Sequence, residues 1–84
     1  MTSAEQQMAE HVIHLIRKPG IHIDENTTLV SSGLIDSMDL VDLLLKLEDI
    51  TNMRIPAGKV QPKDMDTVAK MFATAQRVGK ARKS

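Results

Sequence analysis

A serine at the junction between a glycine-containing loop and an amphipathic segment is the residue best placed for chemistry. Ser37 follows Gly33 and Asp36, and apolar residues at helical spacing begin directly after it. A serine there either caps a helix or presents its hydroxyl for modification. No histidine lies nearby in the sequence, and a serine that acts as its own nucleophile needs an adjacent base. We therefore expect that another enzyme activates Ser37, and that this protein is not itself an enzyme.

The zero net charge of the chain conceals two blocks of opposite sign. Residues 24–50 carry seven acids against one lysine, and residues 51–84 carry eight bases against two aspartates. The acidic block contains Ser37, with Asp36, Asp39 and Asp42 around it. A partner that approaches Ser37 should therefore present a basic surface.

The totals limit the classes of protein that this chain can belong to. Its 84 residues make one small domain with a modest core. It has no cysteine, which excludes disulfides and thiolate metal sites and fits a cytoplasmic location. The polar start shows no signal peptide, and no apolar run could span a bilayer. Phe72 is the only aromatic residue, so no stacking surface for single-stranded nucleic acid is expected.

The elements that must position Ser37 are predicted to be helices. Apolar periodicity predicts helices over residues 4–17 and 37–50, separated by a long polar loop over residues 21–36. Asp36 or Ser37 would cap the second helix. Val41 and Leu45 widen its apolar stripe, which suggests a central helix.

The remaining segments complete an all-α prediction. Residues 57–65 allow one short helical turn, and Asp66 or Thr67 caps a last helix that ends near Gly79. We therefore predict a small four-helix bundle, with three main helices and one short helix, over residues 1–79, followed by a disordered basic tail over residues 80–84. The predicted core consists of Met8, Val12, Leu15, Ile16, Leu29, Leu34, Leu40, Leu43, Leu44, Leu47, Ile50, Ile55, Val60, Val68, Met71 and Phe72.

Other candidate sites are weaker. His11 and His14 lie three residues apart, but spacing supplies no third metal ligand. We expect no metal in the free protein. The basic end could touch nucleic acid, although without aromatic residues a solvated tail is the simpler interpretation.

Residues 33–43, read as Gly-Leu-Ile-Asp-Ser-Met-Asp-Leu-Val-Asp-Leu, resemble the attachment-site signature of acyl carrier and peptidyl carrier proteins. The resemblance continues to an Ile55-Pro56 step and resumes at residues 66–69, and so covers nearly the whole chain. It implies a 4'-phosphopantetheine arm on Ser37, added from coenzyme A by a phosphopantetheinyl transferase. The thiol of that arm would hold acyl or aminoacyl groups as thioesters.

The same resemblance assigns roles around the attachment site. Asp36 would help to bind magnesium in the transferase complex. Docking to the basic patches of partner enzymes, which include an acyl or amino-acid ligase, would involve Asp36, Met38, Asp39, Asp42 and Glu48. Weak, salt-sensitive docking suits a shuttle that must leave each partner. We expect a monomer that binds no nucleic acid and has no membrane span.

Two departures from the family pattern narrow this expectation. Met38 stands where the family usually has leucine, with a similar apolar volume. Residues 57–63 are basic, whereas typical fatty-acid carriers are acidic there. The chain is in this respect more similar to stand-alone D-alanyl or aminoacyl carriers, which suggests a specialised lipid or secondary-metabolite pathway. Two alternatives remain: a helical protein–protein interaction module in which Ser37 is only a cap, and a nucleic-acid-binding domain.

Overall fold

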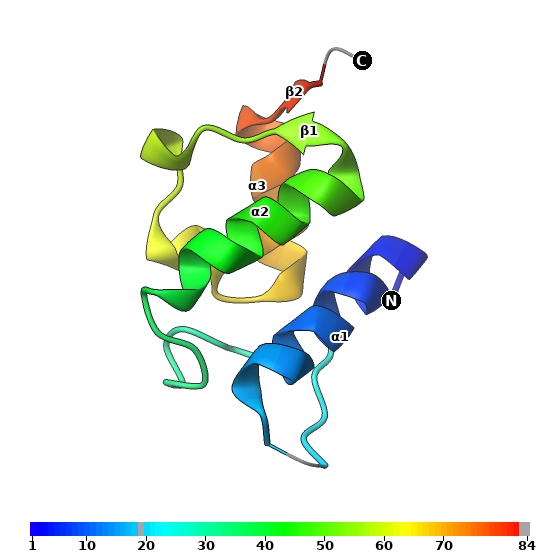
Figure 1. The fold of residues 1–84 in the computed structure, drawn as a ribbon, viewed down its shortest axis with the longest axis vertical. Coiled ribbons are helices and arrows are strands. Elements are labelled where there is room, and N and C mark those ends of the chain that lie inside the picture. Colours follow the sequence, from blue (N-terminus) through cyan, green and yellow to red (C-terminus); the bar gives the residue numbers. More distant parts are fainter. Residues whose placement is uncertain (19, 83–84) are drawn as a thin grey trace.

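Three helices form the body of the protein in the computed structural model, which describes residues 1–18 and 20–82. In chain order they are α1 (Ser3–Ile16), α2 (Asp39–Thr51) and α3 (Val68–Val78), and each of them contacts the other two. Figure 1 shows α2 lying across α3, with α1 below them. The predicted small helical fold is confirmed at this level, and all three helices lie within a few residues of their predicted bounds.

The prediction of a four-helix bundle is wrong. The expected short helix is replaced by two 3₁₀ helices, η1 (Ala57–Lys59) and η2 (Pro62–Met65). Pro62, at the first position of η2, suits a helix start because it has no N–H to leave unpaired. Val60 lies between the two in an extended conformation, so the backbone turns twice instead of forming one helix.

A small antiparallel sheet closes the C-terminal end, contrary to the all-α prediction. Strand β1 (Met53–Arg54) pairs with β2 (Lys80–Ala81), with Met53 opposite Ala81. Residues 80–81 thus form a strand where a disordered tail was expected, and residues 83–84 lie outside the described residues. Each strand has only two residues, so no alternating pattern could announce it.

The ends of the helices follow local rules. Thr2 and Glu5 form a capping box at the start of α1, in which each side chain accepts the other's backbone N–H. Thr67 caps α3 by accepting the backbone N–H of Lys70. Arg17 and Asn52 adopt the left-handed conformation that commonly ends a helix.

The core lies between the three helices and includes residues from the long loop. Eight predicted core residues are fully buried: Met8, Val12, Leu29, Leu43, Leu47, Ile55, Val68 and Met71. The other eight are only partly buried at its edge. Five further residues are fully buried, namely Ala9, Ile23, Ile35, Met65 and Ala75.

One carboxylate holds the long loop against α3. Asp66 Oδ1 accepts the backbone N–H groups of Leu29, Val30 and Ser31 at 2.8–3.1 Å. The Ser31 hydroxyl donates to the other oxygen at 2.8 Å. These bonds, led by the one from the Ser31 N–H, lower the pKa of Asp66 although burial opposes them. The loop that leads to Ser37 is therefore anchored by a residue that lies 35 to 37 positions later in the sequence.

Candidate functional site

Ser37 lies in a tight turn immediately before α2 and is exposed to solvent. The turn is closed by a backbone hydrogen bond of 3.1 Å from the Asp39 N–H to the Asp36 carbonyl. None of the side-chain hydrogen bonds in the described part of the chain involves the Ser37 hydroxyl. That hydroxyl can therefore be approached from solvent without breaking an internal contact.

Asp36, and not Ser37, caps α2. Asp36 Oδ1 accepts the backbone N–H groups of Met38 and Asp39 at 2.9 and 3.1 Å. Asp39 Oδ2 accepts the Asp36 N–H at 3.2 Å, which completes a reciprocal arrangement like a capping box. Of the two caps that the sequence allowed, the structure uses the aspartate. Ser37 is left on the solvent side of the cap, with no structural hydrogen bond to make.

Two of the expected docking acids, Asp42 and Glu48, contact other residues of the chain. Asp42 is exposed, and its Oδ2 lies 2.7 Å from His11 Nε2, which links α2 to α1. Glu48 Oε2 accepts the Ile55 N–H at 2.8 Å, and Glu48 Oε1 lies 3.9 Å from Arg82. Its side chain is only 15% exposed, so Glu48 supports the turn after α2, and its role in docking stays a prediction. Beside Ser37, the side chains of Asp36 and Asp42 are exposed and that of Asp39 is half-buried.

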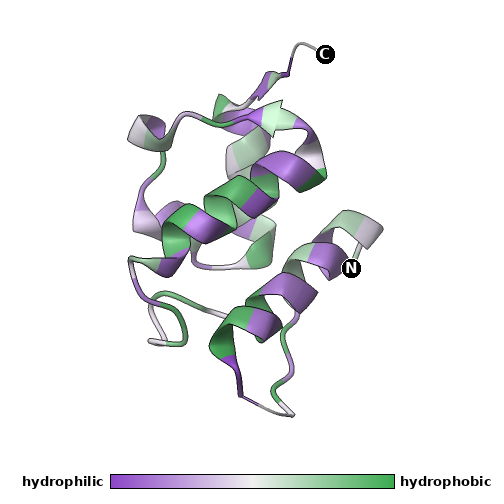
Figure 2. Cartoon of the chain, in the orientation of Figure 1, coloured by the Kyte–Doolittle hydropathy of each residue, from purple (hydrophilic) through white to green (hydrophobic). Residues whose placement is uncertain are grey.

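An apolar stripe on α2 faces solvent beside Ser37. Met38 is 82% exposed, Val41 66% and Leu45 57%. Their spacing of three and four residues places them on one face of the helix. Val41 and Leu45, which widen the apolar stripe of α2 in the sequence, therefore lie on its exposed side. Figure 2 shows α2 as a largely hydrophobic ribbon interrupted by hydrophilic residues, as expected for a helix with apolar residues on more than its core face.

An apolar hollow of about 240 Å³ lies between the first half of α2 and the two 3₁₀ helices. We call it the apolar hollow; its lining residues are Leu40, Val41, Leu44, Ala57, Val60, Gln61, Pro62 and Met65. Leu40 and Val41 begin one turn after Ser37, so the hollow and the serine belong to the same end of α2. The sequence did not reveal this hollow, because its walls come from segments about twenty residues apart.

Neither a metal-binding cluster nor a membrane-spanning helix occurs among the described residues. No group of three or more histidine, cysteine or acidic residues able to hold a metal occurs within the described residues, and His11 is paired with Asp42. No helix in the described ranges is both long enough and apolar enough to cross a membrane.

Comparison with known proteins returned no match, either to a family model or to a curated protein. The functional argument therefore depends on the residues and geometry of this chain.

Proposed function

We propose that this protein is a carrier whose Ser37 holds a 4'-phosphopantetheine arm, and that acyl or aminoacyl groups travel on the arm as thioesters. The observation that carries the proposal is the exposed Ser37 hydroxyl beside a cap formed by Asp36. A serine that capped the helix would have its hydroxyl engaged by backbone N–H groups.

The surroundings of Ser37 fit the proposed group. The attached phosphate would lie near the N-terminal end of α2, where the helix dipole favours negative charge. The carboxylates of Asp36 and Asp39 are also negative. They would repel the attached phosphate and so direct it outward. The arm would extend into solvent, and an apolar cargo could shelter in the apolar hollow.

The chemistry requires a second protein. Attachment forms a bond between Ser37 Oγ and the phosphorus of the phosphopantetheine half of coenzyme A, and breaks the pyrophosphate link, so that adenosine 3',5'-bisphosphate leaves. The serine proton goes to a base of the transferase, because no histidine lies close to Ser37 in the sequence. Asp36 would contribute a carboxylate to magnesium in that complex. After attachment, the chain binds and presents the cargo and catalyses no step itself.

Partner docking is proposed for the start of α2. Met38, Val41 and Leu45 supply exposed apolar contact, and Asp36, Asp39 and Asp42 supply charge around it. An apolar centre with a charged rim is the usual composition of a protein interface. The downstream basic residues favour a dedicated ligase over a general fatty-acid system as the partner.

Intact-mass measurement tests the attachment. Incubation with coenzyme A, magnesium and a broad-specificity transferase should add the mass of one phosphopantetheine to the wild type and none to Ser37→Ala. Ser3→Ala is the matched control, because Ser3 is also an exposed serine at the first position after a helix cap. Ser3→Ala should gain the full increment. An unmodified wild type, under conditions that convert a known carrier, would contradict the proposal.

The alternative of an interaction module with a capping Ser37 is weakened by the cap geometry. Its cap would have to be Asp36, and the module would dock through Met38, Val41 and Leu45 without any modification. The same mass experiment separates the two proposals.

A further inference from the structure

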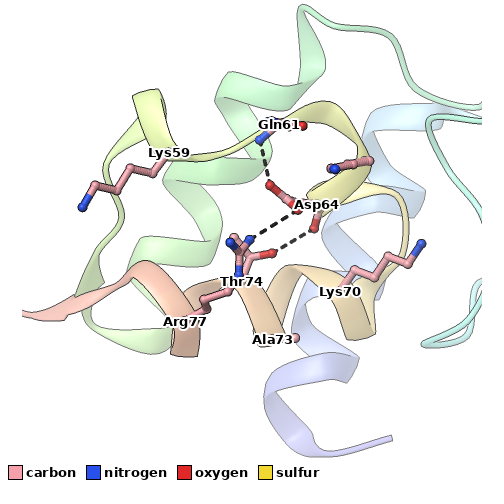
Figure 3. Close-up of a pocket in the computed structure, with 8 residues that line it drawn as sticks. Lys59, Gln61, Asp64, Lys70, Ala73, Thr74 and Arg77 are labelled. Carbon is pink, nitrogen blue, oxygen red and sulfur yellow. Dashed lines mark hydrogen bonds and ion pairs between the residues drawn. The ribbon is translucent and has the colours of Figure 1, made fainter.

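A basic hollow of about 590 Å³ lies between the segment 59–64 and α3 (Figure 3). Its lining residues are Lys59, Gln61, Lys63, Asp64, Lys70, Ala73, Thr74 and Arg77. Four bases against one acid leave a balance of three positive charges. Nothing in the proposed attachment at Ser37 uses this hollow.

The three lysines of the basic hollow are exposed and without acidic partners. Lys59, Lys63 and Lys70 are absent from the ion pairs formed among the described residues. Arg77 differs, because its Nη2 lies 3.4 Å from Asp64 Oδ1. Three solvated ammonium groups are thus available to an outside ligand.

The arrangement fits several separate carboxylates better than one small anion. Asp64 lies in the middle of the basic hollow, where its Oδ2 accepts the Gln61 N–H at 2.9 Å. A single phosphate placed there would meet this carboxylate. In Figure 3 the side chains of Lys59 and Lys70 point away from each other, so in this arrangement they do not converge on one ion.

Charge elsewhere on the molecule favours a protein over a nucleic acid. The lining contains no aromatic residue for base stacking. The radius of gyration is only 12.0 Å, and screening at physiological salt acts over about 8 Å. On so small a molecule, a polyanion much longer than the hollow would run onto surface that carries exposed acids, among them Asp36 and Asp42. An acidic patch on a folded protein has a limited extent and avoids that repulsion.

The position of the basic hollow also suits a protein partner. Gln61 lines both the basic hollow and the apolar hollow, so the two are neighbours. A protein surface that covers both would meet an apolar region flanked by charge, as interfaces usually do.

We propose that the basic hollow is a docking surface for an acid-rich protein surface, separate from the acidic start of α2. A partner with acidic residues against the lysines and basic residues against α2 would bind the molecule in one orientation only. The proposal goes beyond the carrier function and does not require modification of Ser37.

A titration followed by ¹⁵N–¹H spectra tests it, with a blocked octaglutamate peptide as the probe. At low salt the amide signals of Lys59, Lys63, Lys70 and Arg77 should shift in a saturable way. Lys59→Gln/Lys63→Gln/Lys70→Gln should weaken binding about tenfold, since each exposed pair contributes little alone. Far-UV circular dichroism should show the fold unchanged, because all three side chains are exposed.

The matched control removes the same number of positive charges elsewhere. Arg17→Gln/Lys18→Gln/Lys46→Gln should bind the peptide within about twofold of wild type. An equal loss in both variants, or an absence of shifts at the hollow, would overturn the proposal. A single-stranded DNA octamer that binds there more tightly than the peptide would replace it with nucleic-acid binding. Equal shifts with inorganic phosphate would overturn the proposal of a protein-docking surface and show a general anion site instead. Ser37→Ala should bind like wild type, which separates this test from that of the carrier function.

Discussion

Asp36 and Asp39 cap each other across Ser37: the carboxylate of Asp36 accepts the Asp39 N–H at 3.1 Å, and that of Asp39 accepts the Asp36 N–H at 3.2 Å. The two carboxylates thus accept the backbone N–H groups at the start of α2. The serine between them makes no side-chain hydrogen bond within the described residues. The stability of the helix and the chemistry of the serine are therefore separable by mutation.

Asp36→Ala should lower the free energy of unfolding by about 1 kcal/mol, because it removes the cap of α2. Ser37→Ala should change it by less than about 0.5 kcal/mol, as for other exposed substitutions. Urea unfolding at pH 7, followed by circular dichroism, measures both. Asp36→Asn is the control, since asparagine caps as well as aspartate. If Ser37→Ala costs as much as Asp36→Ala, the serine is the cap after all.

Asp66→Ala should cost about 2 kcal/mol, because the backbone N–H groups of Val30 and Ser31 lose a charged acceptor, whereas the Leu29 N–H keeps its bond to the Asp66 carbonyl. The pKa of Asp66 is lower in the folded protein than in the unfolded chain. Its contribution is therefore full above the unfolded value of about 3.9 and is lost as the pH falls through the lower, folded value. Unfolding of both proteins from pH 7 to pH 2 should show the difference between them shrinking below about pH 4. A difference that is constant over this range would contradict the assignment.

Leu43 and Leu45 lie two residues apart on α2 and should respond differently to the same change. Leu43 is fully buried and Leu45 is 57% exposed. Leu43→Ala should cost about 3 kcal/mol, and Leu45→Ala less than about 1 kcal/mol. We also expect Leu45→Ala to slow modification by the transferase, since it removes part of the proposed docking stripe. Equal losses of stability would place Leu45 in the core and remove it from the docking surface.

Gly79→Ala should destabilise the junction between α3 and β2 by about 1–3 kcal/mol. A methyl group there would meet the Ala75 carbonyl oxygen and lie 2.7 Å from the Met53 side chain. Gly58→Ala is the matched control, because a methyl group at Gly58 meets nothing within 4 Å. It should be neutral or slightly stabilising. Thermal unfolding that ranks the two variants in the opposite order would show that β2 does not pack as described.

The sequence predicted the three helices because each carries a clear apolar period and local signals at its ends. For α3 these are Thr67, which starts the helix, and Gly79, which ends it. Those signals lie within one turn of the chain and need no tertiary information. The expectation that Ser37 is an attachment site came from the resemblance of residues 33–43 to the carrier signature, and it stays a prediction.

The rest depended on contacts between distant segments. Asp66 or Thr67 was expected to cap the last helix; Thr67 does so, and the partners of Asp66 lie more than thirty residues earlier. The sequence suggested that Glu48 is a surface acid, but its carboxylate accepts the Ile55 N–H seven residues later. Periodicity carries no information on such pairings.

The mass of the protein purified from its own cells tests the central claim most directly. The account predicts a species heavier than the sequence by one phosphopantetheine, with or without an acyl or aminoacyl group on the thiol. Replacing the gene with one that encodes Ser37→Ala should remove that increment entirely. A wild-type protein found only at the mass of its sequence would contradict the claim that Ser37 carries the arm.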